Sequence, residues 1–148
     1  MDARIVPWIV ALPLAGALVN GLVGGRLGRR GTSLVACLAV LGAFLLSVAA
    51  TQALVASPRH AAQVVRLFEW IAVADFRISV AFQWDPLSAL LALVVTVVGF
   101  LIHVYSVGYM AEDPDYSRYF TYLNLFVASM LVLVLGANLL VLFVGWEL

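Results

Sequence analysis

Long apolar stretches alternate with short polar ones along almost the whole chain. Four of these stretches are long enough to cross the ~30 Å hydrocarbon core of a membrane as helices, which takes about 20 residues. They cover residues 5–25, 32–56, 87–107 and 118–135. The pattern predicts an all-α membrane protein, a polytopic transmembrane helix bundle with four full spans.

A fifth apolar stretch, residues 139–148, is only about half as long and contains the carboxylate Glu147. If Asn138 caps this helix at the membrane surface, nine steps of ~1.5 Å place Glu147 roughly 13–14 Å deeper, close to the midplane. A charged carboxylate there costs ~2.5–3.5 kcal/mol and marks a functional site by default. Glu147 is therefore the first candidate residue.

The shortness of residues 139–148 favours a fragment of a longer protein, with a truncated fifth span. The alternative is that Leu148 is the true C-terminus. In that case Glu147 is simply a polar residue beside a terminal carboxylate.

The segment of about residues 64–84, between the second and third spans, has the period of a β-hairpin. Phe76, Ile78 and Val80 alternate with polar or small residues, as in a half-buried strand. The turn is expected at residues 72–75. Because an isolated hairpin is marginally stable in water, we expect this one to dock against something.

Helix boundaries can be predicted from local capping signals. Asp85 followed by Pro86 indicates an N-cap and first helical position, Asp113 with Pro114 indicates another helix start, and Gly136 indicates a helix end. Only one residue separates Gly136 from Asn138, so the fourth and fifth helices should form an antiparallel pair.

Composition agrees with this class of protein and excludes others. The chain is 65% hydrophobic and 11% charged, which is typical of an integral membrane protein. Its formal net charge of zero, without a basic cluster interleaved with aromatic residues, argues against nucleic-acid binding. The single Cys37 excludes an internal disulfide and a cysteine-based metal site, and no cofactor or metal site is predicted.

His103 is the second candidate residue. It lies ~25 Å along the third span from Pro86, which places it near the far membrane interface. Two interpretations remain open, a satisfied interfacial histidine and a proton carrier.

Membrane orientation depends on arginine, since the chain has no lysine. Arg26, Arg29 and Arg30 crowd the short loop between the first two spans, and dense positive charge favours the cytoplasmic side. The hairpin and the turn at residues 136–138 are then expected on the opposite face.

Four sequence blocks resemble the large antiporter-like subunits of respiratory complex I. They are QWDPLS at 83–88, HVYSVGYM at 103–110, DPDYSRYFTYLNLF at 113–126 and NLLVLFVGWEL at 138–148. The resemblance covers nearly the whole chain, which would form the N-terminal part, residues 1–148, of such a subunit. Sodium/proton antiporter and membrane-bound hydrogenase subunits share the later blocks.

This resemblance implies a bundle of many transmembrane helices whose central proton path uses a glutamate on the fifth helix, the position of Glu147. In the family, lysines on later helices pair with that glutamate, and the hairpin links neighbouring subunits. The implied function is redox-coupled proton translocation as a membrane-arm subunit of NADH–quinone oxidoreductase. No redox chemistry or cofactor is expected in this chain itself.

The implied partners are the other membrane subunits of complex I, protons and the lipid bilayer, with a multi-pass location in the bacterial cytoplasmic membrane. The alternative functions are a subunit of a sodium/proton antiporter or of a membrane-bound hydrogenase complex. A non-transporting membrane scaffold is a further alternative, in which Glu147 would be dispensable.

Overall fold

The computed structural model describes residues 3–56, 62–74 and 76–148. A short 3-10 turn, η1 (Ala3–Ile5), precedes the long helix α1 (Val6–Ala56). The strands β1 (Gln63–Val73) and β2 (Phe76–Trp84) follow, and then the helices α2 (Pro86–Tyr109), α3 (Tyr116–Leu135) and α4 (Leu139–Glu147). The protein is mostly helical with one two-stranded sheet, as predicted.

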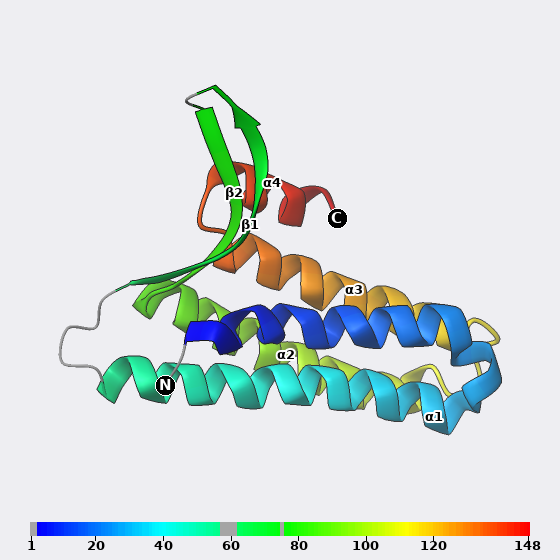
Figure 1. The fold of residues 1–148 in the computed structure, drawn as a ribbon. Coiled ribbons are helices and arrows are strands. Elements are labelled where there is room, and N and C mark those ends of the chain that lie inside the picture. Colours follow the sequence, from blue (N-terminus) through cyan, green and yellow to red (C-terminus); the bar gives the residue numbers. More distant parts are fainter. Residues whose placement is uncertain (1–2, 57–61, 75) are drawn as a thin grey trace.

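Helix α1 doubles back on itself at Gly28. This residue has φ 66° and ψ 174°, a left-handed conformation that glycine adopts without a steric penalty. The blue and cyan limbs of α1 lie antiparallel in Figure 1. They pack closely, because a Cβ atom on Gly16 would lie 2.8 Å from the Cβ of Ala39. The two limbs correspond to the first two predicted spans.

Within the described residues, three helices are long and apolar enough to cross a membrane, namely α1, α2 and α3. Their outward side chains are largely apolar, with Leu22 82% exposed on α1 and Leu101 60% exposed on α2. Such faces suit a lipid environment. Helix α4 has nine residues and is too short to cross alone.

The three long helices share one core. Gly99 brings α2 close to its neighbours, since a Cβ there would lie 3.1 Å from Val127 of α3 and 3.7 Å from Val40 of α1. Val40 and Leu131 are completely buried. The core continues to the base of the hairpin, where Phe82 and Trp84 are buried against the same cluster.

The β-hairpin stands at one end of the bundle, beside α4 (Figure 1). Its strands are antiparallel, with Val73 paired to Phe76 and Gln63 paired to Trp84. The predicted turn at residues 72–75 is therefore too long, because Ala72 and Val73 belong to β1. Asp75 lies outside the described residues. The described part of the turn is Ala74, which has φ 50°.

Strand β1 does not pair residue for residue with β2. The register shifts between Arg66 and Phe68 and again between Glu69 and Ile71, so Leu67 and Trp70 are bulge residues. A bulge inserts an unpaired residue and bends the strand. Leu67, Phe68 and Trp70 are 45%, 60% and 48% exposed, so much of the apolar surface of β1 is uncovered.

Two of the predicted helix caps are confirmed. The Asp85 carboxylate accepts a hydrogen bond from the Ser88 N–H at 2.7 Å, and the Asn138 side chain accepts one from the Val141 N–H at 3.0 Å. The predicted start of the fourth helix at Asp113 is wrong. Helix α3 begins at Tyr116, because the Asp113 side chain accepts from the Asp115 N–H at 2.8 Å and forms a turn instead.

Candidate functional site

Helix α4 presents the candidate carboxylate, and its position is fixed by contacts at both of its ends. At its start, the Asn138 side chain caps the helix and also donates to the Ser79 carbonyl of β2 at 2.8 Å. The adjacent Ala137 N–H donates to the Ala81 carbonyl at 3.0 Å. These bonds tie the α3–α4 turn to the hairpin.

Near its other end, α4 lies against α3 through Gly145. A Cβ atom there would lie 2.8 Å from the Leu133 Cα and 2.9 Å from the Ser129 carbonyl oxygen, and closer still to the Leu133 nitrogen. Only a residue without a side chain allows this backbone contact. The position two residues before Glu147 is therefore tightly constrained.

Glu147 itself is exposed at the end of α4. Within the part of the chain that the structure describes, its carboxylate forms no ion pair. The only two ion pairs among these residues are Arg77 with Glu69 and Arg118 with Asp115, both at the surface. The contacts at both ends of α4 therefore fix the backbone at Glu147, while its side chain stays exposed.

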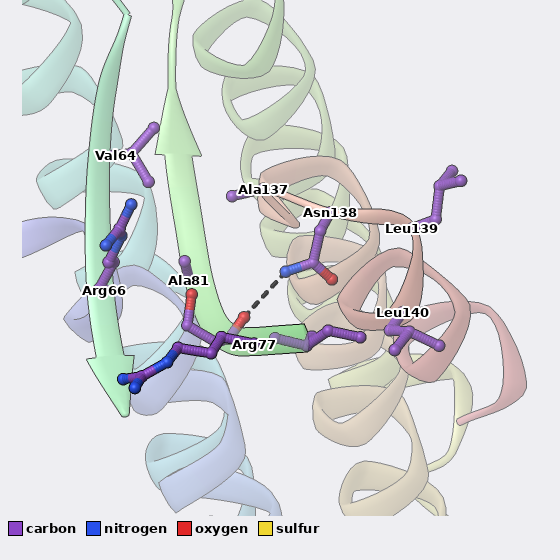
Figure 2. Close-up of a pocket in the computed structure, with 10 residues that line it drawn as sticks. Val64, Arg66, Arg77, Ala81, Ala137, Asn138, Leu139 and Leu140 are labelled. Carbon is purple, nitrogen blue, oxygen red and sulfur yellow. Dashed lines mark hydrogen bonds between the residues drawn. The ribbon is translucent and has the colours of Figure 1, made fainter. Parts of the chain in front are cut away.

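A cavity of about 570 Å³ lies beside the start of α4 (Figure 2). Arg66 and Arg77 of the hairpin lie on one side of it, and Asn138 and Leu140 lie on the other. Arg77 is 3.4 Å from the Glu69 carboxylate. The hairpin side of the cavity therefore carries two arginines, one of them paired with a carboxylate, and the start of α4 lines the other side.

His103, the second candidate, is completely buried between α2 and α3. Its Nδ1 is 2.7 Å from the Gly99 carbonyl oxygen, and its ring lies 6.0 Å from that of Phe120. Its Nε2 is buried without a hydrogen-bond partner. The described contacts of His103 are with α2 and α3, so they do not join it to Glu147 on α4.

Other polar groups gather on the same half of the bundle. Asn20 and Asn124 are almost fully buried, and each has a side-chain oxygen without a partner among the described residues. Ser117 donates to the Asn20 carbonyl at 3.1 Å, and Ser106 lies 2.9 Å from the Tyr119 hydroxyl. None of these residues was among the candidates predicted from the sequence. An asparagine inside an apolar span is the signal that could have found Asn20 and Asn124.

At the end of the bundle far from the hairpin, the turn in α1 is bound to the loop between α2 and α3. Arg29, next to the Gly28 turn, donates to the carbonyls of Ala111 and Asp113, the second at 3.4 Å. Its guanidinium also lies 6.0 Å from the centre of the Tyr116 ring. The predicted arginine-rich loop is therefore at the end opposite the hairpin (Figure 1).

These features define a class, namely an integral membrane helix bundle with a projecting hairpin and a carboxylate on a short, anchored helix. A family model described as "NADH-Ubiquinone oxidoreductase (complex I), chain 5 N-terminus" matches residues 70–120. The NADH-quinone oxidoreductase subunit L of Mycobacterium tuberculosis (strain H37Rv) is 45% identical over 140 residues. That alignment covers 94% of this chain and 22% of the relative.

Fungal proteins are similar as well. NADH-ubiquinone oxidoreductase chain 5 of Cryphonectria parasitica is 37% identical over 139 residues, which is 94% of this chain and 21% of the relative. The chain spans about a fifth of the length of these relatives. The resemblance to the antiporter-like subunits of complex I is confirmed, and the chain is related to them over nearly all its length.

Proposed function

We propose that this chain contributes to proton translocation in the membrane arm of an NADH–quinone oxidoreductase, with Glu147 as a proton-relay carboxylate. The observation that carries the proposal is the anchoring of α4. Asn138 fixes one end of this helix to the hairpin, and Gly145 fixes the other end against α3. The similarity to subunit L and chain 5 proteins supports the same assignment.

The chemistry follows from the environment of a carboxyl group. An apolar surrounding favours its protonated form, and a nearby positive charge favours the ionised form. A cation that approaches and leaves Glu147 would therefore make it release and take up a proton. This chain has no lysine, so we propose that another part of the assembly supplies the cation.

The membrane topology proposed for this role has α1 crossing the membrane twice. As a straight helix its 51 residues would measure about 76 Å, far more than the ~30 Å hydrocarbon core. Folded at Gly28, each limb is longer than the ~20 residues needed for one crossing. Helices α2 and α3 cross once each, and α4 begins a fifth crossing.

We propose further that the hairpin docks on a neighbouring subunit. Strand β1 carries Phe68 and Trp70, 60% and 48% exposed, which line an apolar groove with Val141 and Val144 of α4. Val73, near the tip of the hairpin, is 66% exposed. Exposed apolar side chains that adjoin each other mark interaction surfaces. The partner is another membrane subunit of the complex, in the bacterial cytoplasmic membrane that the mycobacterial relative suggests.

The test of the proposed function is Glu147→Gln in the assembled complex. This change retains the shape and hydrogen-bonding capacity of the side chain but removes its titratable proton. We expect proton pumping to fall strongly while the assembled amount stays near that of the parent, since removing a charge from the membrane does not hinder insertion.

A matched control is Glu112→Gln, because Glu112 is an exposed carboxylate in the α2–α3 loop. This control should pump like the parent. Normal pumping by Glu147→Gln in a fully assembled complex would contradict the relay role and favour a scaffold.

A further inference from the structure

Three arginines lie around the turn of α1 at Gly28, the end of the bundle opposite the hairpin (Figure 1), and they differ in their contacts. Arg29 donates to two carbonyls of the α2–α3 loop. Arg26 and Arg30 are exposed, and neither takes part in the two ion pairs found among the described residues. Two positive charges therefore stay available on the outside of this turn.

Each of these two arginines continues a stripe of exposed leucines along its limb of α1. Each stripe has four-residue spacing: Leu18, Leu22 and Arg26 on the first limb, and Arg30, Leu34 and Leu38 on the second. Residues four apart lie on the same face of a helix. The four leucines are 57%, 82%, 58% and 59% exposed in chain order. Because the limbs are antiparallel, both apolar stripes end in an arginine at the same surface.

The backbone between Arg26 and Arg30 is open to a ligand. Gly28 reverses the chain there with φ 66°. A Cβ atom at Gly28 or at Gly25 would meet nothing within 4 Å. A phosphate group therefore has room to approach the turn between the two guanidinium groups.

The carboxylates at this end of the bundle are engaged elsewhere or stand apart. They belong to the α2–α3 loop, where Asp115 lies 3.5 Å from Arg118 and the Asp113 side chain accepts from the Asp115 N–H. Glu112 is exposed and forms neither of the two ion pairs among the described residues. The positive charge of Arg26 and Arg30 is therefore not neutralised by the part of the chain that the structure describes.

We propose that the Gly28 turn is a binding site for an anionic phospholipid, with the phosphate between Arg26 and Arg30 and the acyl chains along the two leucine stripes. Phosphate oxygens accept hydrogen bonds from guanidinium N–H groups, whose planar fork matches their geometry. Each arginine near a membrane surface favours an anionic lipid about 5-fold, which is ~1 kcal/mol. The site needs only that the turn lies at a membrane surface, on either side, and it is independent of Glu147.

The experiment measures which lipid contacts Leu22. Leu22→Cys in a Cys37→Ser background carries a bimane fluorophore, and the full chain is reconstituted in bilayers with brominated lipids, which quench the fluorophore on contact. Brominated phosphatidylglycerol, which is anionic, competes with phosphatidylcholine, which has no net charge. We expect phosphatidylglycerol to be preferred at Leu22 by up to about 25-fold, from two arginines at about 5-fold each.

A matched reporter is Leu101→Cys on α2, in the same background. Leu101 is also exposed and lies about two turns before the end of α2, at the same end of the bundle. The last turn of α2 contains no basic residue. Phosphatidylglycerol and phosphatidylcholine should therefore compete equally at Leu101.

The variant Arg26→Gln with Arg30→Gln should reduce the preference at Leu22 to that at Leu101. Arg118→Gln, the matched change of an exposed arginine that is paired with Asp115, should leave it unchanged. About 1 M salt should also weaken it, because salt screens exposed charges. Equal competition at Leu22 in the parent would overturn the proposal and leave an acidic protein surface as the partner of these arginines. A preference that survives the double change would overturn it as well.

Discussion

The backbone contact at Gly145 makes a quantitative prediction about the helix that carries Glu147. Gly145→Ala would place a Cβ 2.8 Å from the Leu133 Cα and 2.9 Å from the Ser129 carbonyl oxygen. These neighbours are backbone atoms and cannot rotate away. Overpacking of this kind destabilises by about 1–3 kcal/mol. Replacing glycine in a helix interior gains up to ~1 kcal/mol in helix propensity.

Three backbone atoms are crowded at once, so the upper part of that range, about 2–3 kcal/mol, applies here. The net effect on the docking of α4 against α3 is then about 1–2 kcal/mol, which is a factor of roughly 5–30 in the docking equilibrium. Val141, 3% exposed on α4, reports this equilibrium when it is replaced by cysteine. The background carries Cys37→Ser, which removes the single native thiol. Since a buried thiol reacts only when α4 opens, the maleimide labelling rate should rise by the same factor.

The matched control is Gly108→Ala on α2, where a Cβ would meet nothing within 4 Å. This variant should label at the parent rate. If Gly145→Ala labels at the same slow rate as Gly108→Ala, the contact at Gly145 does not hold α4 in place. Glu147 would then not be positioned by the packing of α4 on α3.

Three further predictions concern the ends of the bundle. The hydrogen bond from the Ser88 N–H lowers the pKa of Asp85. The ionised carboxylate therefore stabilises the fold fully above its ordinary pKa of ~3.9, and this stabilisation is lost as the pH falls through the lowered pKa. The melting temperature of Asp85→Asn should lack this loss at acid pH. Cysteines at Ser79 and at Gly28, with Cys37 replaced, should label from opposite sides of the membrane, and outside labelling at Gly28 would reverse the orientation. Phe68→Ser should reduce the amount of assembled complex without reducing insertion, and unchanged assembly would contradict hairpin docking.

Features that depend on a few adjacent residues could be predicted from the sequence. Asp85 and Asn138 were predicted as caps because a capping side chain bonds to an N–H three residues later. The hairpin was predicted from alternation, and the short loop at Gly28 from the gap between two long apolar stretches. Each of these signals lies within one short window of the chain.

Features that depend on pairing between segments could not be predicted. The bulges at Leu67 and Trp70 arise from the register between β1 and β2, and the turn is short because Val73 pairs with Phe76. The burial of His103 depends on the close packing of α2 against α3 at Gly99. The sequence indicated only how far along its helix His103 lies, which placed it near the membrane interface.

The candidate carboxylate was found by a different kind of signal. A glutamate in an apolar run is conspicuous in the sequence, but its surroundings depend on segments distant in the sequence. The structure adds the two anchors of its helix, the Asn138 bond to Ser79 and the backbone contact at Gly145. Neither contact can be predicted from the sequence between Asn138 and Gly145, because each involves a residue of another element.

The central claim, that Glu147 relays protons, is tested most directly by the number of protons pumped per NADH oxidised in the assembled complex. Glu147→Asp retains the acid and withdraws it by one methylene, so partial pumping is expected, whereas Glu147→Gln should pump least. The predicted order is parent, then Glu147→Asp, then Glu147→Gln, at equal assembly. Equal proton yields for all three would contradict the claim.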